Sequence, residues 1–143
     1  MVLPTPKKFT DKIPRNLTQL GRRKPTDLTA EDVATARLYI DKYWKKLTRH
    51  HPKDDESLLG LPNPYLVPAF EEGHEFDFNE LYYWDSFFMV QGMLDMEHKE
   101  LVLGILEDLI YTFERFKVIP NASRTYLMGR SQPPFLSTFI IES

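Results

Sequence analysis

Aromatic and acidic side chains are crowded together between Phe78 and Phe88, where six aromatic residues surround Glu80 and Asp85. An aromatic ring can stack on the apolar C–H face of a sugar, and a carboxylate beside it can accept hydrogen bonds from two hydroxyls. A structural interpretation is equally open, in which Asp85 caps the following helix and the rings belong to the core. This stretch alone does not decide between a sugar site and a helix start.

A second group of polar side chains falls in the loop predicted for residues 120–134. It contains Asn121, Arg124, Arg130 and Gln132. These planar groups, which can each make several hydrogen bonds, suit adjacent hydroxyls or a carboxylate. Loops on a rigid scaffold commonly hold ligands, but such side chains also cap neighbouring helix ends. The loop is therefore ambiguous as well.

Three helices are predicted to position these two groups. Apolar residues recur at helical spacing over residues 30–49 and 99–117, and the run 86–97 is apolar on most sides. Thr29 and Asp32 predict a capping box at the start of the first helix. No strand alternation competes with these patterns, so the fold class is predicted to be all-α without a substantial sheet.

The remaining segments are predicted to be irregular. Residues 1–28 are rich in proline and charge, and we expect an N-terminal arm there. Residues 58–65 contain two prolines, which exclude a helix, and we expect an extended segment lying on the surface. Broad apolar helix faces on only three helices indicate a piece of a larger helical assembly.

Composition narrows the function classes. The net charge of -3 argues against a binder of nucleic acid, and the absence of cysteine excludes disulfides and thiolate metal sites. No apolar run is long enough to span a membrane, and the first residues lack the apolar core of a signal peptide. These features predict a cytoplasmic protein with no membrane partner.

Two motifs together are more specific than either group alone. Tyr-Tyr-Trp-Asp-Ser-Phe-Phe at 82–88 is followed by Arg-Ser-Gln-Pro-Pro at 130–134. This pair resembles the two N-terminal signatures of trehalases, glycoside hydrolase family 37, and residues 61–68 resemble the stretch before the first signature in bacterial members. The tryptophan-aspartate motif recurs loosely in related glycosidases, whereas Arg-Ser-Gln-Pro-Pro is much more specific. The resemblance covers roughly residues 30–140.

The resemblance implies a fold, a reaction and a set of sugar-binding residues. The fold would be an (α/α)6 toroid with a central pocket, to which residues 29–143 contribute the N-terminal helices. The reaction would be hydrolysis of α,α-trehalose to glucose with inversion, without metal or cofactor. Two aromatic residues would pack around a glucose ring and four polar residues would bind its hydroxyls: Phe78, Trp84, Asp85, Asn121, Arg130 and Gln132.

Three departures from the family pattern matter. Asp77 stands where the family usually has a sugar-contacting arginine, and Ser123 replaces a usual asparagine. The family's catalytic aspartate and glutamate are expected C-terminal to this chain. Inversion needs an acid and a base with room for water between them, so we assign catalysis to no residue present. We expect an N-terminal fragment that is inactive alone.

Two alternatives to a trehalase fragment stay open. One is a non-catalytic remnant that binds a sugar or a protein partner. The other is a related (α/α)6 glycosidase that acts on a different glycoside. In each case, exposed apolar helix faces are predicted to favour self-association.

Overall fold

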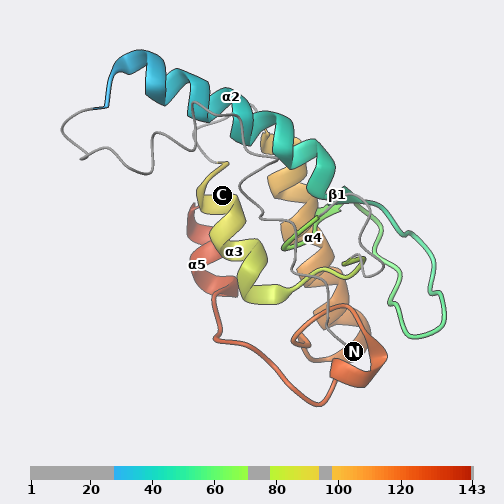
Figure 1. The fold of residues 1–143 in the computed structure, drawn as a ribbon. Coiled ribbons are helices and arrows are strands. Elements are labelled where there is room, and N and C mark those ends of the chain that lie inside the picture. Colours follow the sequence, from blue (N-terminus) through green and yellow to red (C-terminus); the bar gives the residue numbers. More distant parts are fainter. Residues whose placement is uncertain (1–27, 71–77, 94–97, 143) are drawn as a thin grey trace, which may run out of the picture. The chain divides into compact units, whose positions relative to one another are not determined.

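The computed structural model describes residues 28–70, 78–93 and 98–142, and its described part is mostly helical with one small sheet (Figure 1). The chain divides into two compact units, Met1–Lys45 and Lys46–Ser143. Among the described residues, no helix is both long and apolar enough to cross a membrane. In chain order the elements are α2 (Ala30–Leu47), β1 (Thr48–Arg49), β2 (Tyr65–Leu66), α3 (Tyr83–Gln91), α4 (Lys99–Phe116), a 3-10 turn (Thr125–Leu127) and α5 (Leu136–Glu142).

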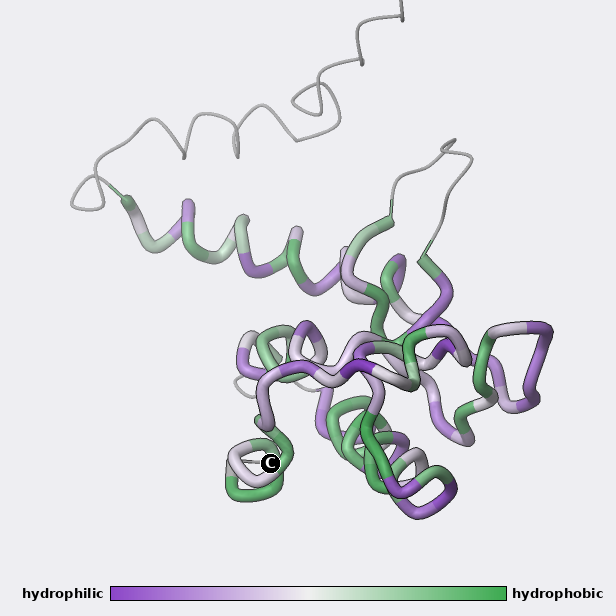
Figure 2. Tube along the Cα trace, turned by 90° about the horizontal axis from the view of Figure 1, so that it is seen from below, coloured by the Kyte–Doolittle hydropathy of each residue, from purple (hydrophilic) through white to green (hydrophobic). Residues whose placement is uncertain are grey.

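The first helix begins with the predicted capping box. The backbone N–H of Asp32 donates to Thr29 Oγ1 at 3.1 Å, and the N–H of Thr29 donates to Asp32 Oδ2 at 3.0 Å. Each side chain thus satisfies the other residue's amide at the helix start. The predicted end at residue 49 is two residues too late, because Thr48 and Arg49 form strand β1. Figure 2 shows hydrophobic and hydrophilic residues alternating along α2, in which Leu47 is the buried residue.

Strand β2 corrects the prediction for residues 58–65. Leu61 and Tyr65 are 1% and 0% exposed, so the apolar side chains of this stretch are buried, whereas Pro62 and Pro64 are exposed. The reason is pairing and packing: β2 is antiparallel to β1, with Arg49 opposite Tyr65, and α4 packs against β2. Strands of two residues are too short to show alternation in the sequence.

Helix α4 is the centre of the second unit and fits its prediction to within one residue. Its apolar side chains Val102, Ile105 and Leu109 are buried, and the helix contacts β2, α3 and α5. The chain leaves it through Lys117, whose φ of 59° is left-handed and ends the helical hydrogen bonding.

A loop between β1 and β2 is tied to the C-terminal end of α4. Arg115 Nη1 donates to Asp54 Oδ1 at 2.9 Å, and the same oxygen accepts from the N–H of Gly60 at 2.8 Å. A Cβ at Gly60 would lie 2.5 Å from the carbonyl carbon of Lys53. Glycine is therefore required here by the close approach of two backbone segments.

Candidate functional site

The two motif-bearing segments lie side by side in the structure. Tyr82 and Ala122 form an antiparallel bridge, and the N–H of Tyr83 donates to the carbonyl of Asn121 at 3.1 Å. The N–H of Ser123 donates to the carbonyl of Leu81 at 2.9 Å. The backbone thus brings together residues that α3 and α4 separate in the sequence.

Helix α3 is capped by a side chain from the second motif. Gln132 Oε1 accepts the N–H of Trp84 at 2.8 Å, which satisfies one of the free amides in the first helical turn. The prediction that Asp85 could be the N-cap is wrong, because the helix starts at Tyr83, three residues before the predicted start, and its N-cap is Tyr82. Asp85 instead lies in the first turn, where its charge favours the positive helix end.

Arg130 and Asn121 are joined by their backbones. The N–H of Asn121 donates to the carbonyl of Arg130 at 2.7 Å. Asn121 therefore links the loop containing Arg130 to the first residue of α3, through the bond from Tyr83. The Arg130 side chain is exposed and that of Asn121 is half-buried, so neither belongs to the core.

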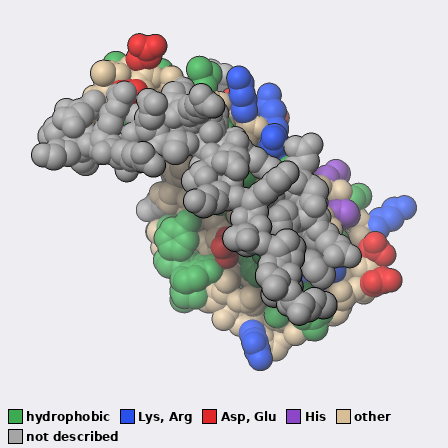
Figure 3. All heavy atoms as spheres, viewed as in Figure 1, with side chains coloured by type: hydrophobic (Ala, Val, Ile, Leu, Met, Phe, Trp, Pro, Cys, Tyr) green, Lys and Arg blue, Asp and Glu red, His purple; other side chains and the backbone are tan. Residues whose placement is uncertain are grey.

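The aromatic residues of the first motif divide into two groups. Tyr83 and Phe87 are buried, and the ring of Phe87 stacks on Phe135 with centroids 4.6 Å apart. Phe78 and Trp84 are 39% and 40% exposed. Hydrophobic side chains gather at the surface where α3 and α5 lie (Figure 3). The expectation that these rings form core is therefore confirmed for Tyr83 and Phe87, and the sugar-site interpretation stays a prediction for the accessible rings.

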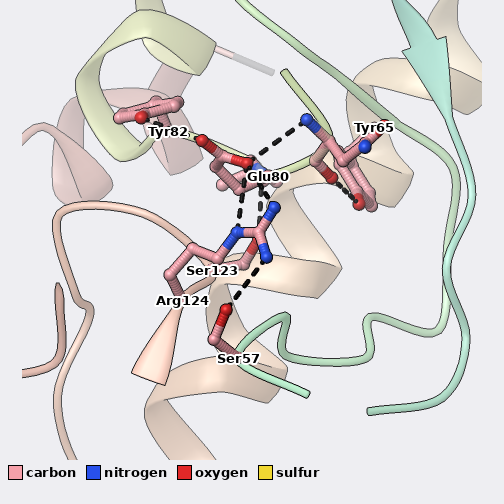
Figure 4. Close-up of polar contacts among 8 residues, drawn as sticks. Ser57, Tyr65, Glu80, Tyr82, Ser123 and Arg124 are labelled. Atoms are coloured by element: carbon pink, nitrogen blue, oxygen red, sulfur yellow. Dashed lines mark hydrogen bonds and ion pairs between the residues drawn. The ribbon is translucent and has the colours of Figure 1, made fainter. Parts of the chain in front are cut away.

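A buried ion pair lies where the two segments meet (Figure 4). Arg124 donates to Glu80 Oε2 from Nη2 at 3.0 Å and from Nε at 3.2 Å, and Tyr82 donates its hydroxyl to Glu80 Oε1 at 3.0 Å. Burial and the bond to Glu80 raise the pKa of Tyr82 to about 12, so the hydroxyl keeps its proton. Arg124 Nη1 also donates to Ser57 Oγ at 3.1 Å.

This network changes the interpretation of two residues. Both oxygens of Glu80 are occupied, so it is poorly placed for proton transfer to a ligand. Ser123, one of the departures from the family pattern, is 3% exposed and accepts the N–H of Leu81 through Oγ at 2.9 Å. Sequence reasoning missed these roles, although Glu80 and Arg124 both stand inside the stretches it selected.

Asp77, which carries the reversed charge among the three departures, lies outside the described residues. No group of three or more potential ligands for a metal ion occurs among the described histidine, aspartate and glutamate residues. A hollow of about 740 Å³ lies at the start of α4, with Asn63, His98 and Lys99 in its lining, and none of the six predicted sugar-binding residues borders it.

Comparison with known proteins yields one family. A family model described as trehalase matches residues 7–143. A periplasmic trehalase of Xanthomonas axonopodis is 39% identical over 117 residues, which cover 80% of this chain and 19% of the relative. Periplasmic trehalases of Pseudomonas aeruginosa and Citrobacter koseri are 36% and 39% identical, over 71% and 74% of this chain and 18% of each relative. The chain thus spans about a fifth of the length of these relatives.

These names overturn one prediction. The relatives are called periplasmic, which contradicts the cytoplasmic location inferred from composition and from the first residues. A helical domain without cysteine is compatible with either compartment, because it needs neither a reducing nor an oxidising environment. Composition was therefore no guide to location.

Proposed function

We propose that this chain, which belongs to the trehalase family, supplies part of the glucose-binding site of an enzyme that hydrolyses α,α-trehalose. The observation that carries the proposal is the bond between Gln132 Oε1 and the N–H of Trp84. It joins the more specific motif to the aromatic one at the residues that the family resemblance assigns to the sugar. The relatives' names supply the substrate.

Each proposed sugar contact has a chemical basis. Trp84 and Phe78 offer exposed ring faces for the apolar side of a glucose unit. Asp85 is a carboxylate one residue beyond Trp84 and can accept two hydroxyls. The oxygen of Gln132 is used by Trp84, which leaves its NH2 group to donate to a sugar oxygen. Arg130 and Asn121 add further donors from the neighbouring loop.

The finer architecture is part of the proposal. Residues 29–143 would form the N-terminal portion of an (α/α)6 toroid, and residues 1–28 would precede it as an arm. The family resemblance implies that the acid and the base would come from outside these 143 residues, and the bonds of Glu80 to Arg124 and Tyr82 make Glu80 a poor candidate for either role. The periplasm would be its compartment, by analogy with the relatives.

The test measures how fast the natural protein that contains this sequence releases glucose from trehalose. The wild type is compared with the Asp85→Asn variant. Losing a charged hydrogen-bond acceptor should lower kcat/KM by about 10- to 100-fold, from the roughly 1.5–3 kcal/mol of such a bond. Glu100→Gln is a matched control, since Glu100 is the acidic residue in the first turn of α4. Full activity of Asp85→Asn would refute its assignment.

Two further arms of that assay address the alternatives. Faster release of glucose from another α-glucoside than from trehalose would favour a related glycosidase. The 143-residue chain, assayed alone, should release no detectable glucose, because acid and base assistance each contribute about 10²- to 10⁴-fold in rate. Robust release by this chain, abolished by Asp85→Ala, would show that the catalytic groups lie within it.

A further inference from the structure

The junction of the two motif-bearing segments is held at one end by a charge pair and at the other by sugar-site residues. Between them runs a short backbone ladder formed by residues 81–83 and 121–123, with N–H to carbonyl distances of 2.9 and 3.1 Å. A ladder this short can slip in register, and a shift of one residue would turn its side chains to the opposite face. Something must therefore fix its alignment.

The charge pair is suited to fixing that alignment. Glu80 directly precedes the ladder on one segment, and Arg124 directly follows it on the other. The Glu80 side chain is 9% exposed, and Arg124 reaches it through both Nε and Nη2. A planar guanidinium bound at two nitrogens sets direction as well as distance. Tyr82 and the N–H of Asn79 complete the coordination of the carboxylate, at 3.0 and 3.2 Å.

The opposite end of the ladder leads directly to the proposed sugar contacts. The N–H of Tyr83 bonds to Asn121, whose own N–H bonds to Arg130. One residue further along α3, the N–H of Trp84 bonds to the side chain of Gln132. A slip or tilt at the ladder would therefore displace Trp84 relative to Arg130 and Gln132.

We propose that Glu80 and Arg124 are positioning residues, whose ion pair fixes the register of this ladder and thereby the arrangement of Trp84, Arg130 and Gln132 around the sugar. The inference rests on the proposed function. A purely stabilising role explains the pair less well, because buried ion pairs can often be replaced by apolar residues at no cost in stability. Their best-attested benefit is conformational specificity, which is what a short ladder needs.

The experiment measures KM and kcat for trehalose in the natural protein carrying Arg124→Met. Displaced sugar contacts should raise KM and lower kcat/KM by about 10- to 100-fold, since misplacement by about 1 Å can cost 10²-fold. Arg115→Met is the matched control, because Arg115 also pairs with a carboxylate, that of Asp54, and lies away from the motifs. It should leave KM within about twofold, as expected for an exposed pair.

Arg124→Lys covers the possibility that the methionine variant does not fold. Lysine keeps the charge but has no two-pronged guanidinium, so KM should still rise several-fold although circular dichroism and melting temperature match the wild type. Wild-type KM in a folded Arg124→Lys or Arg124→Met protein would overturn the positioning role alone. A wild-type protein that releases no glucose from trehalose would overturn the proposed function, and this inference with it.

Discussion

Among the described residues of the second unit, two arginine–carboxylate pairs have the same chemistry and very different surroundings. At the junction of the motifs, the side chains of Glu80 and Arg124 are 9% and 20% exposed. At the end of α4, those of Asp54 and Arg115 are 50% and 34% exposed. Each arginine donates to its carboxylate through two nitrogens, although Arg115 reaches both oxygens of Asp54 and Arg124 reaches only Oε2 of Glu80.

The difference in burial determines what each pair can contribute. Water competes for an exposed pair, and such pairs typically stabilise a protein by less than about 1 kcal/mol. A buried pair loses its hydration on folding, so its net contribution is small, but removing one partner leaves a charge without compensation. The buried pair should therefore be costly to break, and the exposed one should be nearly dispensable.

The largest expected effect is the loss of stability in Arg124→Met compared with Arg115→Met. Breaking the buried pair should destabilise the junction by about 3–5 kcal/mol, because Glu80 would stay buried without its cation. Breaking the exposed pair should cost about 1 kcal/mol or less. The measurement is native-state hydrogen exchange at the amides of Leu81 and Ser123, which lie in the ladder.

Exchange at Leu81 and Ser123 that accelerates equally in both variants would show that burial does not separate the two pairs. An Arg124→Met protein with unchanged protection would show that the junction is held by its backbone and apolar contacts alone.

A third carboxyl group, that of Asp108 in α4, is buried, and its hydrogen bonds in the described chain come from Asn63 and not from an arginine. It is 0% exposed and accepts the backbone N–H of Asn63 at 3.0 Å and its side-chain NH2 at 3.2 Å. Its Oδ2 is buried with no hydrogen-bond partner among the described residues. Burial raises the pKa of Asp108 to about 7, opposed by the bonds from Asn63 and by nearby His50.

Asp108 is therefore expected to make stability depend on pH. A raised pKa means that the folded protein binds the proton more tightly than the unfolded chain, so this stability is complete below about pH 4 and is lost as pH rises through 7. The total should be on the order of 2–4 kcal/mol, from about 1.4 kcal/mol for each pH unit. Asp108→Asn should remove this slope, because asparagine does not titrate.

Urea unfolding of the wild type and of Asp108→Asn between pH 4 and pH 8 measures this effect. The variant's buried NH2 adds a constant penalty of about 1–3 kcal/mol if it finds no acceptor, so the slope and not the offset is diagnostic. Equal slopes in the two proteins would show that Asp108 is ionised throughout this range.

Elements defined by neighbouring residues could be predicted from the sequence, whereas elements that depend on distant residues could not. Helix α4 was predicted to within one residue, because its apolar repeat and the proline that follows it lie close together in the sequence. The start of α3 was predicted three residues late, because the side chain that satisfies an amide of its first turn is that of Gln132, which is 48 positions from Trp84. The strands β1 and β2 were missed because each has two residues, and only their pairing across the chain defines them.

In the candidate site too, the segments could be predicted from the sequence, but the contacts between distant residues could not. The resemblance selected two segments that the structure places in backbone contact. It did not reveal the bond from Arg124 to Glu80, which spans 44 positions and has no periodic signal. It also could not tell buried rings such as Phe87 from exposed ones such as Trp84, since both are aromatic residues of one short helix. The roles of the six sugar-binding residues stay predictions.

The smallest expected effect is that of Asp54→Asn, which tests the exposed pair from its acidic side. The bonds from Arg115 and from the N–H of Gly60 lower the pKa of Asp54 to about 2. A lowered pKa contributes stability that is present above about pH 4 and is lost as pH falls towards 2. Because Asp54 is half exposed, solvent screens this contribution, and we expect the variant to lose less than about 1 kcal/mol at pH 7.

Asparagine keeps an oxygen that can accept the N–H of Gly60, so hydrogen exchange at that amide separates the effect of the lost charge from the effect of the backbone bond. High salt should reduce the difference further, because exposed charges are screened within about 8–10 Å at ordinary ionic strength. A loss as large as that of Arg124→Met, unchanged by salt, would mean that the Asp54–Arg115 pair behaves as a buried one and that the contrast between the two pairs is wrong.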